Sequence, residues 1–222
     1  GSAAHVATVR SLLARTGVDE SALQCGTHPP IDTAENHRLI REGLEPLPVH
    51  NNCSGKHAGM LAATQAWGAD ISDYLNPAGP VQQAGLKNMS LLCGIPVDEI
   101  ILGTDGCGAP IHGMSLQAMA TAFARLVEPS KMPKEIACAA GKLTAAMVSA
   151  PVMVSGEGTF NSELLAAAKG HIIAKGGAEG LFMMGVKSLG LGIAIRTVDG
   201  SNRGQGAVVL RVLQLLNALF RL

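Results

Sequence analysis

The spacing of apolar residues changes near residue 170, and this change limits which folds the chain can adopt. Before it, apolar residues recur at helical spacing, and helices are expected over 5–14, 34–41, 54–67, 77–92, 115–126, 133–147 and 161–169. After it, short apolar runs separated by Gly-containing turns are typical of an antiparallel meander, with strands expected over 172–174, 180–186 and 192–197. Because strands and helices do not alternate, we expect an α+β fold, in which an antiparallel sheet is flanked by helices beside a separate helical region.

Several local signals set expected boundaries. Thr33 and Ser54 each stand where a helix should begin, and their hydroxyl groups make them expected N-caps. The run 99–102 is expected to form a short buried strand that leads into a Gly-rich loop at 103–108. The last amphipathic helix is expected over 203–220. Gly1 and Ser2 resemble a scar of processing and are left out of this reasoning.

Charge and composition restrict the partners of the chain. It carries 17 basic and 17 acidic residues, scattered too evenly to form the basic face that nucleic acid or an anionic membrane would need. Four Phe, one Trp and one Tyr provide no stacking platform for single strands. No apolar run reaches the roughly 18 residues of a membrane-spanning helix. We therefore expect a small-molecule partner, and five cysteines without a secretory signal favour a reducing cytoplasm.

The densest polar cluster lies at 50–57, where a loop enters a helix. Cys53 and Lys56 are three residues apart and should share one helical face. A thiol at a helix N-terminus beside a cation is expected to ionise more easily than a free one. The segment is interpreted as a site, although the alternative is an N-cap surrounded by solvated side chains.

The Gly-rich loop contributes two further candidates, Asp105 and Cys107. Glycines on both sides allow the backbone to approach a ligand, whereas the alternative is a turn in which the Asp bonds its own backbone. If this loop meets the first cluster, Cys53, Lys56 and Cys107 could bind zinc, although a Lys ligand must be neutral and is unusual. The alternative for the two cysteines is a place in the core.

Lys175 stands at the end of an expected strand, next to glycines. A Lys at an edge strand of this kind is similar to one that helps active-site serine hydrolases activate their substrate, and the alternative is an exposed Lys in a hairpin turn. Cys25, Cys93 and Cys138 lie in apolar helical surroundings and are expected to be small core residues. Five histidines have no partner at ligand spacing and are assigned no role: His5, His28, His37, His112 and His171.

The motifs at 50–60, 103–110 and 175–180 together resemble the Rhizobium etli-type L-asparaginases, in order and over nearly the whole chain. The resemblance implies a fold like that of serine β-lactamases, penicillin-binding proteins and glutaminases, hydrolysis of L-asparagine to aspartate and ammonia, and a homodimer. It also implies roles for individual residues: zinc ligands Cys53, Lys56 and Cys107, catalytic Lys175, and substrate-binding His57, Asp105 and Lys56.

The chain departs from this family at its N-terminus. The family's nucleophile is a Ser in a Ser-x-x-Lys motif, and no Ser or Thr of the 222 residues is followed three positions later by Lys. We therefore expect residues 1–222 to be one N-terminally truncated β-lactamase-like domain, with a helical and metal- and substrate-binding region at 44–150 and a sheet with its last helix at 151–222. The nucleophile would then lie outside this sequence. An exposed sheet edge would favour oligomerisation.

Two other functions are compatible with the sequence. The chain could be a non-catalytic zinc or amino-acid binding module that uses the same cysteines without turnover. It could also be a structural fragment with no site, which predicts neither metal binding nor stabilisation by asparagine.

Overall fold

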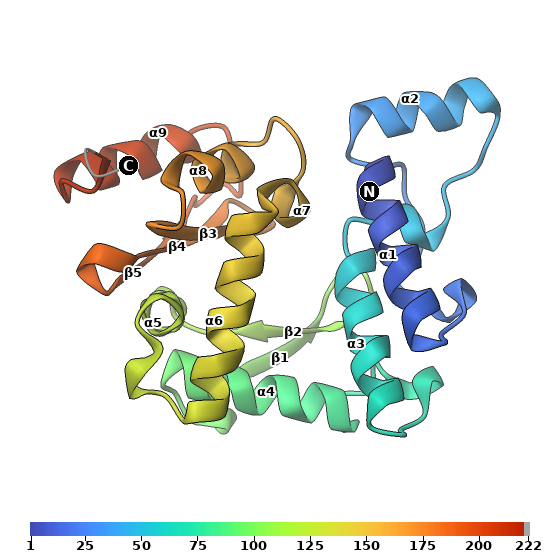
Figure 1. The fold of residues 1–222 in the computed structure, drawn as a ribbon, viewed down its shortest axis with the longest axis horizontal. Coiled ribbons are helices and arrows are strands. Elements are labelled where there is room, and N and C mark those ends of the chain that lie inside the picture. Colours follow the sequence, from blue (N-terminus) through green and yellow to red (C-terminus); the bar gives the residue numbers. More distant parts are fainter. Residues whose placement is uncertain (220–222) are drawn as a thin grey trace. The chain divides into compact units, whose positions relative to one another are not determined.

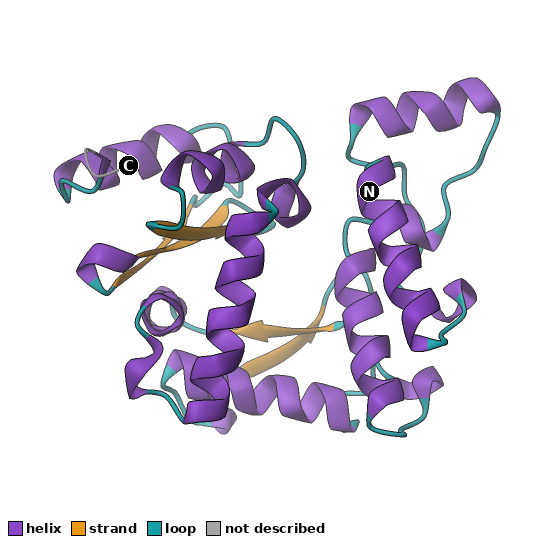
Figure 2. Ribbon diagram, in the orientation of Figure 1, coloured by secondary structure: helices purple, strands orange, loops and turns teal. Residues whose placement is uncertain are grey.

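Helices and two small antiparallel sheets make up residues 1–219, the part of the chain that the computed structural model describes (Figures 1 and 2). The mixed α+β character expected from the sequence is confirmed, with helices predominating. The chain divides into two compact units. Unit 1 comprises 1–88 and 100–113, and unit 2 comprises 89–99 and the residues from 114 onward.

Unit 1 is built around two helices that pack against each other, α1 (Ala3–Thr16) and α3 (Ser54–Ala66). It also contains α2 (Thr33–Glu42), the first part of α4 (Pro80–Cys93), and a hairpin of β1 (Ile101–Thr104) and β2 (Pro110–Gly113). Short 3-10 turns occur at Glu20–Ala22, Pro48–His50 and Ile71–Asp73. The core combines apolar residues of α1 and α3 with residues of the loops around them: Val6, Val9, Leu13, Val18, Leu23, Cys25, Val49, Ala58, Leu61, Tyr74, Cys107 and Ala109.

Unit 2 is organised by a three-stranded antiparallel sheet in the order β3 (Ile172–Gly176), β4 (Leu181–Val186) and β5 (Leu191–Arg196). Its other elements are α5 (Leu116–Val127), α6 (Lys134–Ser149), α7 (Pro151–Ser155), α8 (Phe160–Ala168) and α9 (Gln205–Leu215), with 3-10 turns at Val97–Glu99, Pro129–Lys131 and Lys187–Leu189. The expected meander is confirmed in this sheet.

The two faces of this sheet are packed differently. Alternate residues of β4, Phe182, Met184 and Val186, form a core with apolar residues of α8 and α9. The other face approaches α5 so closely that only glycine fits at two positions. A Cβ atom at Gly192 would lie 1.7 Å from the carbonyl oxygen of Ala120, and one at Gly185 would lie 2.6 Å from Val127 Cγ1.

Several expected boundaries were wrong. The N-cap of α2 is Asp32, whose side chain accepts a hydrogen bond from the Glu35 N–H, and Thr33 is the first helical residue. Ser54 is likewise the first residue of α3 and not its cap. Asp32 has the extended backbone typical of the cap position, whereas Cys53, the residue before α3, has a φ of −96° and a ψ of 0° and makes no side-chain capping bond.

The short strand was also misplaced. It was expected to be buried over 99–102, but β1 runs from Ile101 to Thr104 and is exposed, with Ile101 75% exposed. The physical reason is that, within residues 1–219, β1 pairs only with β2, in a two-stranded hairpin separate from the three-stranded sheet. The helix expected from 77 begins at Pro80, and the expected last helix is α9, which ends at Leu215; its predicted end at Phe220 lies outside the described residues.

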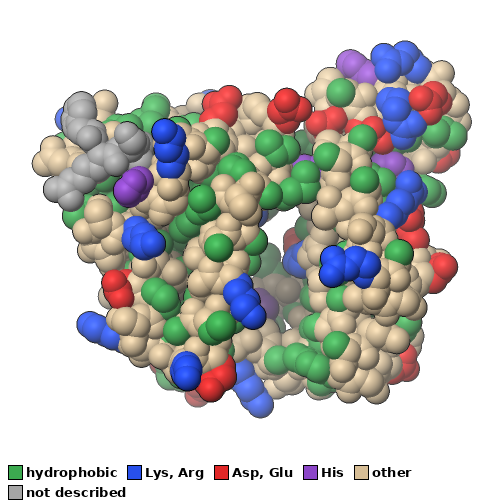
Figure 3. All heavy atoms as spheres, viewed as in Figure 1, with side chains coloured by type: hydrophobic (Ala, Val, Ile, Leu, Met, Phe, Trp, Pro, Cys, Tyr) green, Lys and Arg blue, Asp and Glu red, His purple; other side chains and the backbone are tan. Residues whose placement is uncertain are grey.

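None of the helices in the described part of the chain is long and apolar enough to cross a membrane. On the face drawn in Figure 3, basic and acidic side chains of the described residues are scattered among one another.

Candidate functional site

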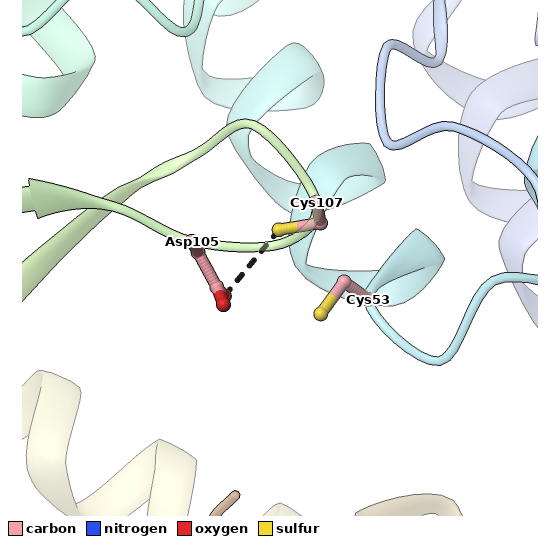
Figure 4. Close-up of side chains that lie close together, drawn as sticks. All are labelled: Cys53, Asp105 and Cys107. Carbon is pink, nitrogen blue, oxygen red and sulfur yellow. Dashed lines mark hydrogen bonds between the residues drawn. The ribbon is translucent and has the colours of Figure 1, made fainter.

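Unit 1 brings together four of the residues that the sequence singled out. Cys53 directly precedes α3, Lys56 lies in its first turn, and Asp105 and Cys107 lie in the turn between β1 and β2. One ligand atom each from Cys53, Asp105 and Cys107 lie within 4.8 Å of one another (Figure 4). We call these four residues the cysteine–carboxylate cluster.

The turn that carries Asp105 is closed by its own backbone. The Asp105 N–H donates to the carbonyl of Ala109 at 2.8 Å, and the Gly108 N–H donates to the carbonyl of Asp105 at 2.9 Å. Gly108 has a φ of 81°, in the left-handed region that favours glycine. The Asp105 carboxylate also accepts from the Gly106 N–H at 2.8 Å. Asp105 therefore bonds the backbone of its own turn, as the alternative interpretation expected, and is also a member of the candidate site.

The loop before α3 is held by a buried amide. The Asn51 side chain accepts a hydrogen bond from the Cys53 N–H at 2.8 Å and donates to the carbonyl of Cys25 at 2.8 Å. Asn51 is 4% exposed, so both bonds are shielded from water. This amide ties the backbone of Cys53 to the loop that carries Cys25.

An ion pair joins the two halves of the cluster. Lys56 Nζ donates to Asp105 Oδ2 at 3.0 Å, and the Cys107 thiol donates to the same oxygen at 3.4 Å. The hydrogen bond from Lys56 lowers the pKa of Asp105. Burial lowers the pKa of Lys56, but the bond to Asp105 and the neighbouring thiols outweigh it, and the net shift is upward. At neutral pH the pair is therefore a carboxylate and an ammonium.

The expectation that Cys53 ionises easily was wrong. Burial raises the pKa of Cys53 to about 11, and the attraction of Lys56 only partly opposes this. The physical reason is that desolvation penalises the thiolate more than one cation across the cluster stabilises it.

The donor set of the cluster suits zinc. Two thiols and a carboxylate are among the ligands that zinc takes in proteins, and here they converge on one place. Lys56 is the least suited of the four to ligate a metal, because its ammonium holds its proton in the ion pair with Asp105. Its role as a ligand stays a prediction, and the carboxylate of Asp105 is the third donor that the geometry brings together with the cysteines.

His57, next in sequence to Lys56, is completely buried. Its Nδ1 lies 2.6 Å from the Tyr74 hydroxyl, and the two rings meet edge to face with centroids 5.5 Å apart. Its Nε2 has no hydrogen-bond partner among the described residues. Burial, followed by the charge of Lys56, lowers the pKa of His57 to about 4, so the ring is neutral at pH 7.

Sequence reasoning missed three residues around the cluster. Tyr74 bonds His57, the Gln24 N–H donates to the Tyr74 hydroxyl at 2.8 Å, and His112 lies on β2 with a pKa lowered by burial and by Lys56. No spacing rule connects these residues. The one available signal was that Tyr74 is the single tyrosine of a chain poor in aromatic residues.

Lys175 belongs to unit 2, on the exposed end of β3. Its ammonium donates to the carbonyl of Gly176. The backbone around it is held by buried Asn161 at the start of α8, whose side chain accepts from the Gly176 N–H at 2.6 Å and donates to the carbonyl of Ala174 at 3.1 Å. The catalytic role of Lys175 stays a prediction.

A family model described as L-asparaginase II matches residues 1–221, which include both units and every candidate residue above. No curated protein matches the chain.

Proposed function

The chain belongs to the L-asparaginase II family, a family of amidohydrolases, and on that premise we propose that it hydrolyses L-asparagine to aspartate and ammonia. The family match over residues 1–221 is the observation that carries the proposal. The chemistry of the cysteine–carboxylate cluster supports it independently.

Asparagine at neutral pH carries an ammonium and a carboxylate on one carbon, and the ion pair of the cluster offers both complementary charges. Asp105 would bind the α-ammonium and Lys56 the α-carboxylate through charge-assisted hydrogen bonds. Their side chains are 35% and 44% exposed, so a ligand from solvent can reach them. His57, beside Lys56, would complete the substrate-binding side of the cluster.

We propose zinc as the metal of this site, held by Cys53 and Cys107. The geometry offers Asp105 as the third donor and the family resemblance implies Lys56, and whichever of the two binds the metal does not also bind the substrate. When bound, zinc would supply a fixed positive charge that orients the substrate. The thiols must lose their protons to become ligands, which makes the affinity fall at low pH.

The reaction itself would follow the acyl-transfer course of enzymes with a hydroxyl nucleophile. The hydroxyl attacks the side-chain amide carbon, ammonia leaves, and water releases aspartate from the acyl-enzyme. Lys175 would move the proton from the hydroxyl to the leaving nitrogen. The attacking hydroxyl is assigned to none of the 222 residues, because no Ser or Thr among them precedes a Lys by three positions.

Three further features are proposed, the first two from the family resemblance and the third from the free cysteines. The fold would be that of a β-lactamase-like domain, and the protein would act as a homodimer. A reducing compartment, the cytoplasm, would keep the adjacent thiols of Cys53 and Cys107 from forming a disulfide.

Ammonia release from L-asparagine tests the function, with L-glutamine as the comparison because it differs by one methylene. Asp105→Asn should lower kcat/KM about 10- to 100-fold, the value of one charge-assisted hydrogen bond, and Asp98→Asn, exposed in unit 2, serves as matched control. The Asn variant should still fold, since a half-exposed ion pair contributes only about 0–1 kcal/mol. Absence of ammonia release from the unaltered protein would contradict the enzymatic function.

A non-catalytic zinc or amino-acid binding module is the second candidate. It is favoured by one observation: the metal donors are assembled within unit 1, whereas no hydroxyl nucleophile is assigned. Stabilisation by zinc or by asparagine in a thermal melt, without ammonia release, would select this function over the first.

A further inference from the structure

The hydroxyl of Tyr74 sits between two polar groups in the core of unit 1. The Gln24 backbone N–H lies 2.8 Å from the hydroxyl oxygen, and His57 Nδ1 lies 2.6 Å from it. Tyr74 is 2% exposed and His57 is fully buried, so water does not compete for these bonds. These are the two hydrogen bonds that the described residues make with this hydroxyl.

Counting hydrogens fixes the direction of each bond. A backbone N–H can only donate, so the Tyr74 oxygen accepts from Gln24. The hydroxyl has one hydrogen, and His57 Nδ1 is the partner left for it. A second bond accepted from an Nδ1–H would leave the hydroxyl hydrogen without an acceptor among the described residues. Nδ1 therefore presents its lone pair, and the single ring proton of His57 is on Nε2.

We propose that Tyr74 is a positioning residue that fixes His57 as its Nε2–H tautomer. This inference rests on the proposed function in one respect, that His57 belongs to the substrate-binding side of the cluster. Tyr74 thereby has two consequences for the site: it occupies Nδ1, which excludes that nitrogen as a metal ligand, and it holds a neutral N–H donor one residue from Lys56.

The second ring nitrogen of His57, Nε2, points to a role of this residue beyond packing. His57 Nε2 is buried and finds no acceptor among the described residues, which is rare for a buried donor. Such a donor is expected where a ligand oxygen or an ordered water completes the site.

Tyr74 is itself anchored well enough to impose this orientation. Its carbonyl accepts from the buried Gln82 side chain at 2.8 Å, and the Gln24 side chain donates to the carbonyl of Ser72 at 2.9 Å. On the other partner, the His57 N–H donates to the carbonyl of Cys53 at 3.0 Å, which starts the helical bonding of α3. Both rings are therefore held by backbone bonds on their own segments.

Long-range ¹H–¹⁵N spectra of the ¹⁵N-histidine-labelled protein test the inference directly. His57→Gln identifies the His57 signals by their loss. We expect the unaltered protein, with and without added zinc, to show the pattern of an imidazole protonated at Nε2 alone. A pattern of Nδ1 protonation, or of both tautomers, would overturn the inference, whether or not the protein hydrolyses asparagine.

Tyr74→Phe removes only the hydroxyl and should release the tautomer, so that Nδ1-protonated His57 becomes detectable. Val9→Ala is the matched control: it trims the same core without touching the pair and should keep the Nε2–H pattern. A Tyr74→Phe spectrum identical to that of the unaltered protein would refute the positioning role. If Tyr74→Phe does not fold, the spectrum of the unaltered protein still decides the tautomer.

Activity separates the failure of this inference from the failure of the proposed function. With L-asparagine, Tyr74→Phe should lower kcat/KM about tenfold, as loss of an outer hydrogen-bond partner does, and Val9→Ala should not. Absence of activity in every protein would contradict the asparaginase function and leave the tautomer result standing. Full activity in a Tyr74→Phe protein whose tautomer has changed would overturn the role of Tyr74 in the site.

Discussion

Replacing Gly192 by alanine should severely test how closely α5 packs on the sheet of unit 2. Gly192 lies on β5 where α5 crosses the sheet. The added Cβ would lie 1.7 Å from the carbonyl oxygen of Ala120 and 2.5 Å from the backbone nitrogen of Ala124. Both obstacles are backbone atoms of one helix, so no side-chain rotation can relieve the clash.

The size of the effect follows from these distances. Ordinary van der Waals contact begins near 3.4 Å, twice the distance available, so α5 and β5 must move apart along their whole contact. Overpacking of a core costs about 1–3 kcal/mol, and a clash with backbone belongs at the upper end of that range. For a chain of this length, about 3 kcal/mol corresponds to a fall in Tm of roughly 6–12 °C.

Gly141→Ala supplies the opposite case. Gly141 lies within α6, and a Cβ there meets no atom within 4 Å. Because glycine weakens a helix interior, this substitution should raise the stability by about 0.5–1 kcal/mol. Thermal melts of the two variants, followed by circular dichroism, should shift in opposite directions. If Gly192→Ala melts at the temperature of the unaltered protein, the close approach of α5 to the sheet is refuted.

Three further predictions concern the metal, the pH dependence and a helix cap. Cys53→Ala should abolish stoichiometric zinc measured by atomic emission after dialysis, whereas Cys138→Ala, exposed on α6, should retain it; equal zinc in both would exclude the cluster as the metal site. The pKa of His57 is about 4 in the folded protein and 6.5 in the unfolded chain, so the protein takes up a proton when it unfolds between pH 4 and 6.5. The free energy of unfolding should therefore fall by about 1.4 kcal/mol per pH unit as the pH drops from 6.5 to 4. Urea titrations should show this slope and its loss in His57→Gln, and a flat profile in the unaltered protein would contradict the burial of a neutral ring. Asp32→Ala should lower the free energy of unfolding by about 1 kcal/mol, and Thr33→Ala should lower it by less. If Thr33→Ala had the larger effect in the same titrations, Thr33 and not Asp32 would be the N-cap of α2.

Local patterns were enough to predict the sheet of unit 2. Its strands combine apolar runs with glycine-containing turns, and these signals act over a few residues. The hairpin of β1 and β2 was harder to predict, because Gly103 and Pro110 weaken the strand signal and β2 has only four residues. Whether Ile101 is buried depends on which sheet β1 joins, and no local pattern contains that information.

The composition of the candidate site was more predictable than its electrostatics. Residue types allowed a zinc ion between Cys53 and Cys107, 54 positions apart, only if their loops met, and the family resemblance implied that these two cysteines are ligands. The direction of the Cys53 pKa shift was predicted wrongly, because the amount of apolar structure around a thiol is a property of the folded core. Tyr74 was missed for the same reason: its bond to His57 joins a helix to a 3-10 turn, a pairing that only the tertiary fold creates.

The side chain of Asn161 has a consequence for how the sheet of unit 2 meets other chains. On the outer edge of β3 it accepts from one backbone N–H and donates to one carbonyl, which are the two groups that an incoming strand would need. A single amide thus takes the place of a neighbouring strand and blocks strand addition beside Lys175. An Asn161→Leu variant would leave the Gly176 N–H and the Ala174 carbonyl unpaired at that edge. We expect this variant to aggregate from its folded state.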